Sequence, residues 1–359
     1  MKRINLTTII KLSFLATILA LPFVSCQKDS DGSPDVKPGT PVLTSITPDS
    51  AQGGQLVILK GSGLGDMSSI LFQKDSVRAA ITSTLNTETV LMFRVPIDAA
   101  GGVQNIIFTN SAGKELSVPF RVLAYPQVFS VSNYDFEDGS EITLTGTNLN
   151  DVTKVVLTGT TDEAAIVSKT KQKLVITMPA TSVFRATLDI TNVTGTKSTT
   201  QEFVSLTNNF VMYADAYGPG AFNGGIQSWS WGCTVSESSD QAKTGTKSLK
   251  VAYADGGLSL FLGSDTWADG HWFTDYFTAA YITFWAKGDG KDVELRIVPD
   301  NPPWSDWATG QQIVTVPKDV WTYFKIPMSF ITGSFGRLDI VINNGTGRTV
   351  YFDDLLFIK

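Results

Sequence analysis

Two short stretches near the C-terminus combine tryptophans with polar side chains in turn-rich sequence. Gly263–Trp272 holds Trp267, Asp269, His271 and Trp272 and is followed by Tyr276, and Pro299–Trp307 holds Asp300, Asn301, Trp304, Asp306 and Trp307. Their proline and Asp/Gly clusters argue against buried strands. A tryptophan ring can pack on the C–H face of a sugar ring, while Asp, Asn and His side chains hydrogen-bond its hydroxyls. The two loops therefore have the composition of a carbohydrate-binding surface.

The predicted site uses both loops. We expect a binding platform of four rings, Trp304, Trp307, Trp267 and Trp272, with hydrogen bonds from Asp300, Asn301, Asp306 and His271 and with Tyr276 nearby. The alternative for each ring is to fold back over the core of its domain. Trp229 and Trp231 fit a sheet edge and the site equally well. Trp285 and Trp321 lie within strand patterns, so we expect them in core or edge packing.

Catalysis is not predicted. A glycoside hydrolase needs two carboxylates about 5–10 Å apart across the scissile bond, and no motif singles out such a pair in loops that contain Asp but no Glu. His271 is the one histidine of the chain, which excludes histidine metal clusters. A Ser-His-Asp triad would depend on that loop residue without a nucleophile-elbow motif. We expect a protein that is not an enzyme and requires no cofactor.

The N-terminus has the features of an export signal. Residues 1–25 begin with basic residues and continue into the apolar run Leu12–Val24, as in a secretory signal peptide. Phe23-Val24-Ser25-Cys26 resembles a bacterial lipobox, which implies cleavage and lipidation of Cys26. Gln27–Asp31 resembles the acidic tag that sends lipoproteins of Bacteroidota to the outer face of the outer membrane. Residues 26–39 are rich in Ser, Asp, Gly and Pro, so we expect a flexible linker after the lipid.

Cysteine content and charge narrow the function classes. Once Cys26 carries lipid, Cys233 is the one remaining cysteine, which excludes an intrachain disulfide and a cysteine metal cluster. The net charge is −6, from 28 basic and 34 acidic residues. This balance gives no basic patch for nucleic acid and favours a neutral ligand.

Six residues recur at a constant offset of 85 positions. Pro41, Gly54, Leu59, Gly61, Leu64 and Asp66 correspond to Pro126, Gly139, Leu144, Gly146, Leu149 and Asp151. The repeat predicts two copies of one domain, at residues 40–124 and 125–206. Short alternating apolar runs between turn residues are typical of antiparallel immunoglobulin-like sandwiches.

The segment Ile46–Leu64 resembles the opening of IPT/TIG immunoglobulin-like domains. The second copy has Ser132-Asn133-Tyr134 in place of the proline-containing turn of the first copy. We expect both domains to serve as spacers that present the third domain, and a second ligand site is the alternative.

Residues 207–359 form the third predicted domain, with eight alternating strand candidates that favour a jelly-roll β-sandwich. Gly245–Val251, Ile282–Gly288, Trp321–Pro327 and Val350–Leu355 resemble successive strands of galactose-binding-like carbohydrate-binding modules. In such modules an acidic residue of the last strand helps to hold a structural calcium ion. The resemblance implies Asp353 or Asp354 as that residue, with Asp215 as a partner. The alternative is that these acids accept hydrogen bonds from turns and loops.

Taken together, signal, acidic tag, two IPT/TIG-like domains and a module-like jelly roll resemble the surface glycan-binding lipoproteins of Bacteroidota polysaccharide-utilisation systems. The resemblance implies an all-β, non-catalytic protein, lipid-anchored in the outer membrane and facing the cell exterior. It also implies a TonB-dependent transporter and its lid lipoprotein as partners. Tryptophan-rich loops on an acidic chain favour a neutral β-glucan, with mannan and arabinoxylan as alternatives. Surface adhesion through protein binding and, after it, glycoside hydrolysis are the alternative functions.

Overall fold

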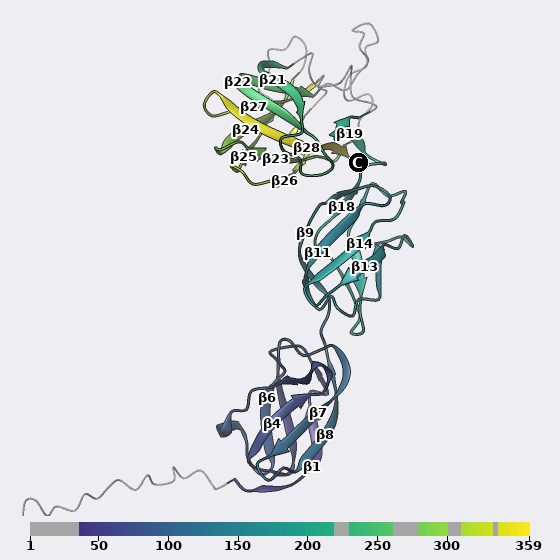
Figure 1. Cartoon of the computed structure of the whole chain (residues 1–359), viewed down its shortest axis with the longest axis vertical. Helices are drawn as coiled ribbons and strands as arrows, with labels where there is room; N and C mark the ends of the chain where they lie inside the picture. Colours follow the sequence, from purple (N-terminus) through teal and green to yellow (C-terminus); the bar gives the residue numbers. More distant parts are fainter. Residues whose placement is uncertain (1–35, 219–229, 261–278, 301–309, 333–336) are drawn as a thin grey trace, which may run out of the picture. The chain divides into compact units, whose positions relative to one another are not determined.

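The computed structural model describes residues 36–218, 230–260, 279–300, 310–332 and 337–359 (Figure 1). Over these residues the chain is built from β-strands with a few short 3-10 turns and no α-helix, which confirms the predicted all-β class. No helix in these ranges has the length and apolar character of a membrane span.

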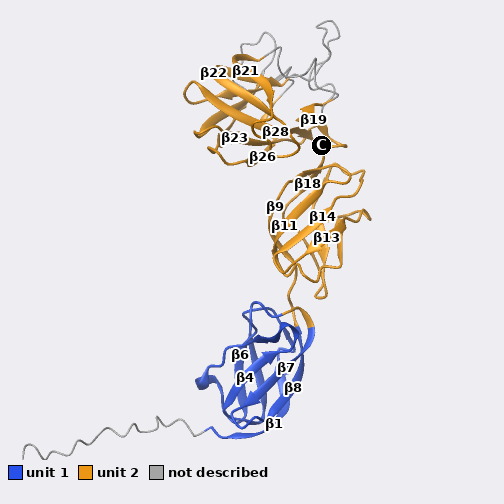
Figure 2. Cartoon of the chain, viewed as in Figure 1, with its two compact units in different colours: residues 1–99, 103–121 blue, residues 100–102, 122–359 orange. Residues whose placement is uncertain are grey.

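The chain divides into two compact units (Figure 2). Unit 1 comprises residues 1–99 and 103–121, and unit 2 comprises residues 100–102 and 122–359. Unit 2 contains two main hydrophobic cores, one in a sandwich from about Phe136 to Phe203 and one in a C-terminal domain from Met212 to Phe357.

Unit 1 is an immunoglobulin-like sandwich of two antiparallel sheets. One sheet has the order β1-β3-β6, formed by β1 (Pro38–Thr47), β3 (Leu56–Leu64) and β6 (Val90–Arg94). The other has the order β2-β8-β7-β4-β5, formed by β2 (Ser50–Ala51), β8 (Glu115–Val122), β7 (Gly102–Asn110), β4 (Met67–Phe72) and β5 (Val77–Arg78). Alternate residues of the strands are buried, as in β7, because successive side chains point to opposite faces. Phe72, Phe93, Phe108 and Phe120 make edge-to-face contacts in the core.

The first part of unit 2 is a second sandwich. Its largest sheet has the order β13-β14-β11-β9, formed by β13 (Ala165–Lys169), β14 (Lys173–Thr177), β11 (Glu141–Thr147) and β9 (Gln127–Val131). The remaining strands are β12 (Lys154–Leu157), β16 (Leu188–Thr191) and β17 (Thr196–Ser198) in one sheet and β10 (Asp135–Phe136), β18 (Phe203–Ser205) and β15 (Arg185–Ala186) in another. A second sandwich thus lies in the region of the second predicted copy, with sheets of four, three and three strands where unit 1 has sheets of three and five.

The C-terminal domain is a jelly-roll-like sandwich, as predicted. Its path β20-β19-β28-β22-β27-β24-β25 is formed by β20 (Ala216–Tyr217), β19 (Phe210–Ala214), β28 (Arg348–Ile358), β22 (Ser248–Leu260), β27 (Arg337–Ile342), β24 (Val293–Asp300) and β25 (Gln312–Val316). β21 (Trp231–Ser238) pairs with β22, and β23 (Tyr281–Gly288) pairs with β26 (Thr322–Pro327) and β28. β28 is buried over nearly its whole length because it is flanked by β19, β22 and β23.

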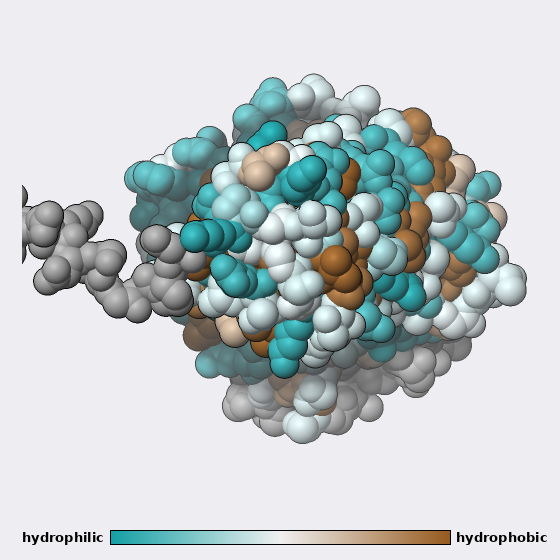
Figure 3. Space-filling view, turned by 90° about the horizontal axis from the view of Figure 1, so that it is seen from below, coloured by the Kyte–Doolittle hydropathy of each residue, from teal (hydrophilic) through white to brown (hydrophobic). Residues whose placement is uncertain are grey.

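Large apolar side chains on the surface are scattered. The exposed ones include Val42, Ile97, Val103, Phe129, Val167, Val193 and Val320. On the face shown in Figure 3, apolar residues are interspersed with hydrophilic ones. Single exposed apolar residues are normal for a folded protein and do not by themselves mark a binding surface.

Candidate functional site

Three neighbouring strands of the C-terminal domain have ends on the same side of the sheet, and two of them lead into the predicted binding loops. β22 ends at Leu260, which pairs with Leu338 near the start of β27. β24 ends at Asp300, which pairs with Arg337. Because β27 lies between β22 and β24, the chain enters segments 261–278 and 301–309 from neighbouring positions on this edge (Figure 1). We call the strand ends at Leu260, Leu338 and Asp300 the loop edge.

The predicted platform residues themselves lie beyond the loop edge. Trp267, His271, Trp272, Tyr276, Asn301, Trp304, Asp306 and Trp307 fall outside the described residues, as do Trp229 and the predicted lipidation site Cys26. Asp300 is the last residue of β24, and its backbone is described while its side chain is not. The structure thus brings together the strands that precede both predicted loops, and the platform residues stay a prediction.

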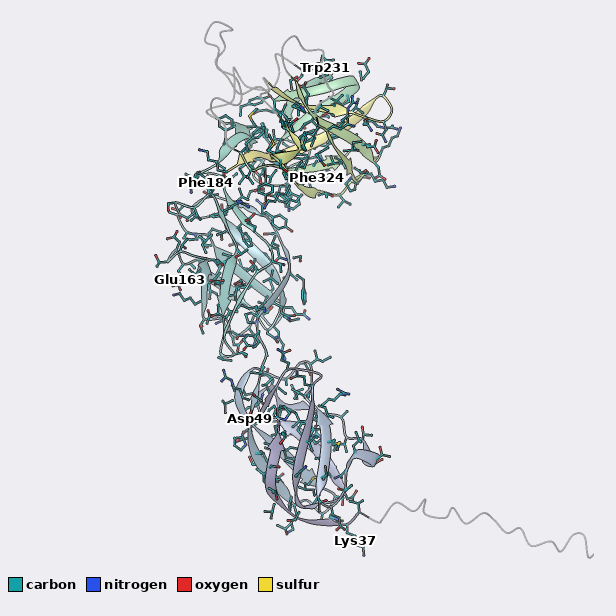
Figure 4. The ribbon with its side chains drawn as sticks, turned by 180° about the vertical axis from the view of Figure 1, so that it is seen from behind. Lys37, Asp49, Glu163, Phe184, Trp231 and Phe324 are labelled. Carbon is teal, nitrogen blue, oxygen red and sulfur yellow. The ribbon has the colours of Figure 1, made fainter. Side chains whose placement is uncertain are left out.

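Trp231 packs on the sheet close to the loop edge. It pairs in register with Gly257 of β22, three positions before Leu260. A Cβ atom on Gly257 would lie 2.9 Å from the Trp231 ring and 3.0 Å from Val341, so the glycine leaves room for the indole. The ring is partly exposed. In Figure 4 Trp231 lies at the end of the C-terminal domain away from the second sandwich, whereas Phe184 lies beside the second sandwich's junction with that domain.

Trp285 has a different role. It is 7% exposed and stacks on Tyr134 of the second sandwich, with ring centroids 5.7 Å apart. Its indole N–H donates to Asn133 Oδ1 at 2.8 Å. Trp321 is partly exposed and lies under the Lys287 ammonium, 5.4 Å from the ring centroid. Trp285 therefore packs against the neighbouring domain. The prediction that Trp321 lies within a strand is wrong, because it directly precedes β26 and contacts Lys287.

The turn Ser132–Asp135, which we call the junction turn, joins the second sandwich to the C-terminal domain. Tyr134 stacks on Tyr323 of β26, and the Tyr323 hydroxyl donates to Asp135 Oδ1 at 3.2 Å. Lys243 donates to the Ser132 carbonyl and lies 4.2 Å from the Trp285 ring centroid. Sequence reasoning missed this contact. The sequence feature that could have indicated this contact is Ser132-Asn133-Tyr134, which replaces the proline-containing turn of the first copy.

A second contact reinforces the junction on the side of β15. Glu202 accepts hydrogen bonds from Arg185 at 3.0 Å and from Lys325 of β26. Both cations also lie over the Tyr281 ring, at 4.9 Å and 4.2 Å from its centroid. Burial opposes ionisation of Glu202, but hydrogen bonds and the charges of both cations outweigh it and hold the Glu202 pKa below its usual value.

The three acids predicted to hold calcium meet the loop that precedes β22. Asp353 Oδ2 accepts from the backbone N–H groups of Lys243 and Thr244 at 2.8 and 3.2 Å. Asp215 Oδ1 accepts from the backbone N–H groups of Thr246 and Lys247. The described residues contain no group of three Asp, Glu, His or Cys side chains placed to hold a metal ion. These hydrogen bonds fit the alternative interpretation, in which the acids accept from turns and loops. Calcium binding at these acids stays a prediction.

Asp354 and Asp353 have strongly perturbed pKa values. Burial, reinforced by the charge of Asp354, raises the pKa of Asp353 to about 7. Burial also raises the pKa of Asp354 to about 6, although hydrogen bonds from Asn133 and Thr244 oppose the rise. Burial likewise lowers the pKa of Lys243, against the attraction of both aspartates. The junction therefore concentrates negative charge in an interior that disfavours it.

Comparisons with known proteins agree with this architecture. Residues 41–122 match the IPT/TIG domain family. The fold is similar to that of the surface glycan-binding protein PbSGBP-B from Prevotella bryantii, with a TM-score of 0.53 and 19% identity over 89% of this chain and 99% of that one. No curated protein sequence matches this chain.

Two further solved structures are weaker neighbours. An SGBP-B from a complex xyloglucan utilisation locus in Bacteroides uniformis has a TM-score of 0.43 and 16% identity, over 89% of this chain and all of that one. The SGBP-B of a Bacteroides ovatus mixed-linkage glucan utilisation locus, solved with a mixed-linkage heptasaccharide, has a TM-score of 0.35 and 15% identity, over 87% and 72%.

Proposed function

We propose that this protein is a non-catalytic, cell-surface polysaccharide-binding protein whose ligand binds at the tryptophan loops of the C-terminal domain. The observation that carries the proposal is the loop edge, because β22 and β24, which flank β27, both end there and lead into the two tryptophan-rich segments. The fold that 89% of this chain shares with a protein described as a surface glycan-binding protein supports it.

The chemistry of the loops suits a neutral sugar polymer. Tryptophan rings bind the apolar faces of successive sugar rings, and Asp300, Asn301, Asp306 and His271 hydrogen-bond the hydroxyls. Trp231 lies close enough to the loop edge to extend this surface. A β-glucan, which presents flat faces and carries no charge, is the ligand we propose.

Lipidation of Cys26 would anchor the protein in the outer membrane with its binding domain outside the cell. There it would hand polysaccharide to a TonB-dependent transporter and its lid lipoprotein. Repetition of weak sites on the surface would raise the effective affinity for a long polymer.

The proposal is tested with the soluble protein from Gln27 onward in native affinity gels. The gels contain laminarin, mixed-linkage glucan, xyloglucan, mannan or xylan, and each incubation is assayed for released reducing sugar. We expect retardation by a β-glucan without release of sugar. Retardation by none of the polymers would contradict glycan binding and favour adhesion to protein, and released sugar would contradict the non-catalytic assignment.

A further inference from the structure

A pocket of about 860 Å³ lies where the second sandwich meets the C-terminal domain. Five of its lining residues are acidic, Asp135, Glu137 and Glu141 from the second sandwich and Asp215 and Asp354 from the C-terminal domain. Lys243 is the one basic residue among the lining residues described. Both domains thus contribute to a strongly negative pocket, which we call the junction pocket.

Asp135 is the most constrained of these acids. It is 2% exposed, and its Oδ1 atom accepts the hydrogen bond from Tyr323. Its Oδ2 atom is buried and has no hydrogen-bond partner among the described residues. A buried carboxylate oxygen without a partner is expensive to retain, so it points to a missing ligand.

The charges around Asp135 do not balance. Asp135, Asp353 and Asp354 are all buried. Lys243 is the charged group of opposite sign that acts on all three, and its ammonium already binds the Ser132 carbonyl and the Trp285 ring. Burial raises the pKa of all three carboxyl groups. When all three are ionised, the single ammonium leaves two negative charges without a counterion. Such an imbalance in a low-dielectric interior is strongly unfavourable.

We propose that a divalent cation, calcium, binds in the junction pocket between the free Oδ2 atom of Asp135 and the carboxylate of Asp354. Calcium is a hard cation that takes about six to eight oxygen ligands, and carboxylates, carbonyls and waters supply them. Its charge matches the two unbalanced negative charges. The pocket has room for the waters that would complete the coordination.

This site differs from the one implied by the resemblance to carbohydrate-binding modules. Asp215 and Asp353 accept hydrogen bonds from backbone N–H groups of the 243–247 loop, and Asp215 also accepts one from the Thr246 hydroxyl. Asp354 accepts hydrogen bonds from the Thr244 hydroxyl at 3.1 Å and from the Asn133 amide at 3.3 Å. Asp135 comes from the other domain. A cation held by Asp135 and Asp354 would therefore lock the second sandwich to the C-terminal domain.

The test is calorimetric titration of the metal-free protein with calcium chloride, together with thermal unfolding in EDTA and in excess calcium. We expect one calcium ion per chain and a higher Tm with calcium. Asp135→Asn and Asp354→Asn should each weaken calcium binding more than about 10-fold, as expected for loss of a ligand. Asp215→Asn, a change in the same pocket, should leave calcium binding intact.

Asparagine keeps the acceptor for the Tyr323 hydroxyl, so Asp135→Asn is expected to fold, and its circular dichroism spectrum checks this. Two results would overturn the proposal. One is the absence of calcium binding by the unaltered protein in both assays. The other is calcium binding that survives Asp135→Asn and is lost in Asp215→Asn, which would place the ion at the acids of the C-terminal domain alone.

Discussion

The rings of Tyr134 and Tyr323 stack across the junction of two domains with centroids 4.4 Å apart and planes 27° from parallel. Tyr134 belongs to a turn of the second sandwich. The corresponding turn of the first sandwich, 85 positions earlier, is Thr47-Pro48-Asp49. At this turn the second sandwich contacts the C-terminal domain, through Tyr134 and through the hydrogen bond from Trp285 to Asn133.

We expect Tyr134→Ala to uncouple the two domains of unit 2. The change removes the stacking on Tyr323 and Trp285, so it should lower the free energy of unfolding by about 2–3 kcal/mol, within the range for aromatic truncations at packed sites. Differential scanning calorimetry should show one transition of unit 2 splitting into two.

Phe129→Ala is the control for this change, because Phe129 is an aromatic residue of the same sandwich that is 64% exposed. It should leave the calorimetric trace almost unchanged. If Tyr134→Ala behaved like Phe129→Ala, the junction turn would not couple the domains.

The ion pairs of Glu202 give a second measure of the junction. Glu202→Gln removes the charge that Arg185 and Lys325 share, so it should destabilise unit 2 by about 1 kcal/mol. Glu163→Gln is the matched control, since Glu163 pairs with Lys154 at 3.8 Å on an exposed surface (Figure 4). That change should have almost no effect in urea unfolding. Equal effects of the two changes would argue against a special role for Glu202.

Stability should depend on pH through Asp353 and Asp354. Their folded pKa values, about 7 and about 6, lie above the ordinary value of 3.8. The folded state therefore binds protons more readily than the unfolded state. Stability in EDTA should rise as the pH falls from about 8 to about 5, by up to about 1.4 kcal/mol per pH unit for each group.

Glu202 does not reverse this trend, because its lowered pKa means that its contribution is lost only at more acidic pH. Asp353→Asn should reduce the slope in urea unfolding measured across this range. Calcium bound at the junction should flatten the slope in the unaltered protein. Stability that falls between pH 8 and 5 in EDTA would contradict the pKa directions given for both aspartates.

Trp231 allows a test of glycan binding beside the loop edge, because it pairs with Gly257 three positions before Leu260. Trp231→Ala should weaken glycan binding by about 10-fold, since one aromatic contact with a sugar contributes roughly 1–1.5 kcal/mol. Trp321→Ala alters another partly exposed ring, one that lies under Lys287. It should bind glycan normally. Equal losses in both variants would indicate a general disturbance of the domain and not a local contact.

The fold was largely predictable from the sequence because local patterns determine it. The offset of 85 positions and the two-residue alternation indicated two sandwiches and a third β domain. The junction was not predictable in the same way. Trp285 has a strand pattern that fits core or edge packing, and its partner Tyr134 lies far away in sequence, so periodicity carries no information about the contact.

The candidate site shows the same division. Residue types indicated a sugar-binding surface, but the nearness of the strand ends Leu260 and Asp300 depends on β27 lying between β22 and β24. β27 follows both β22 and β24 in the sequence. Its position between them is therefore set by pairing between distant segments. Asp135 was not predicted as a site residue, because the hydrogen bond that it accepts from Tyr323 joins residues 188 positions apart in the sequence.

The central claim is tested most directly by titrating the polysaccharide that retards the protein into three forms of it, by isothermal calorimetry. The forms are the unaltered protein, a variant with Trp267→Ala and Trp304→Ala, and a variant with Trp321→Ala. We predict binding by the first and third forms and a loss of at least about 100-fold in the second, from two lost aromatic contacts. Unchanged affinity in the second form, with folding intact by circular dichroism, would contradict the assignment of the glycan site to these loops.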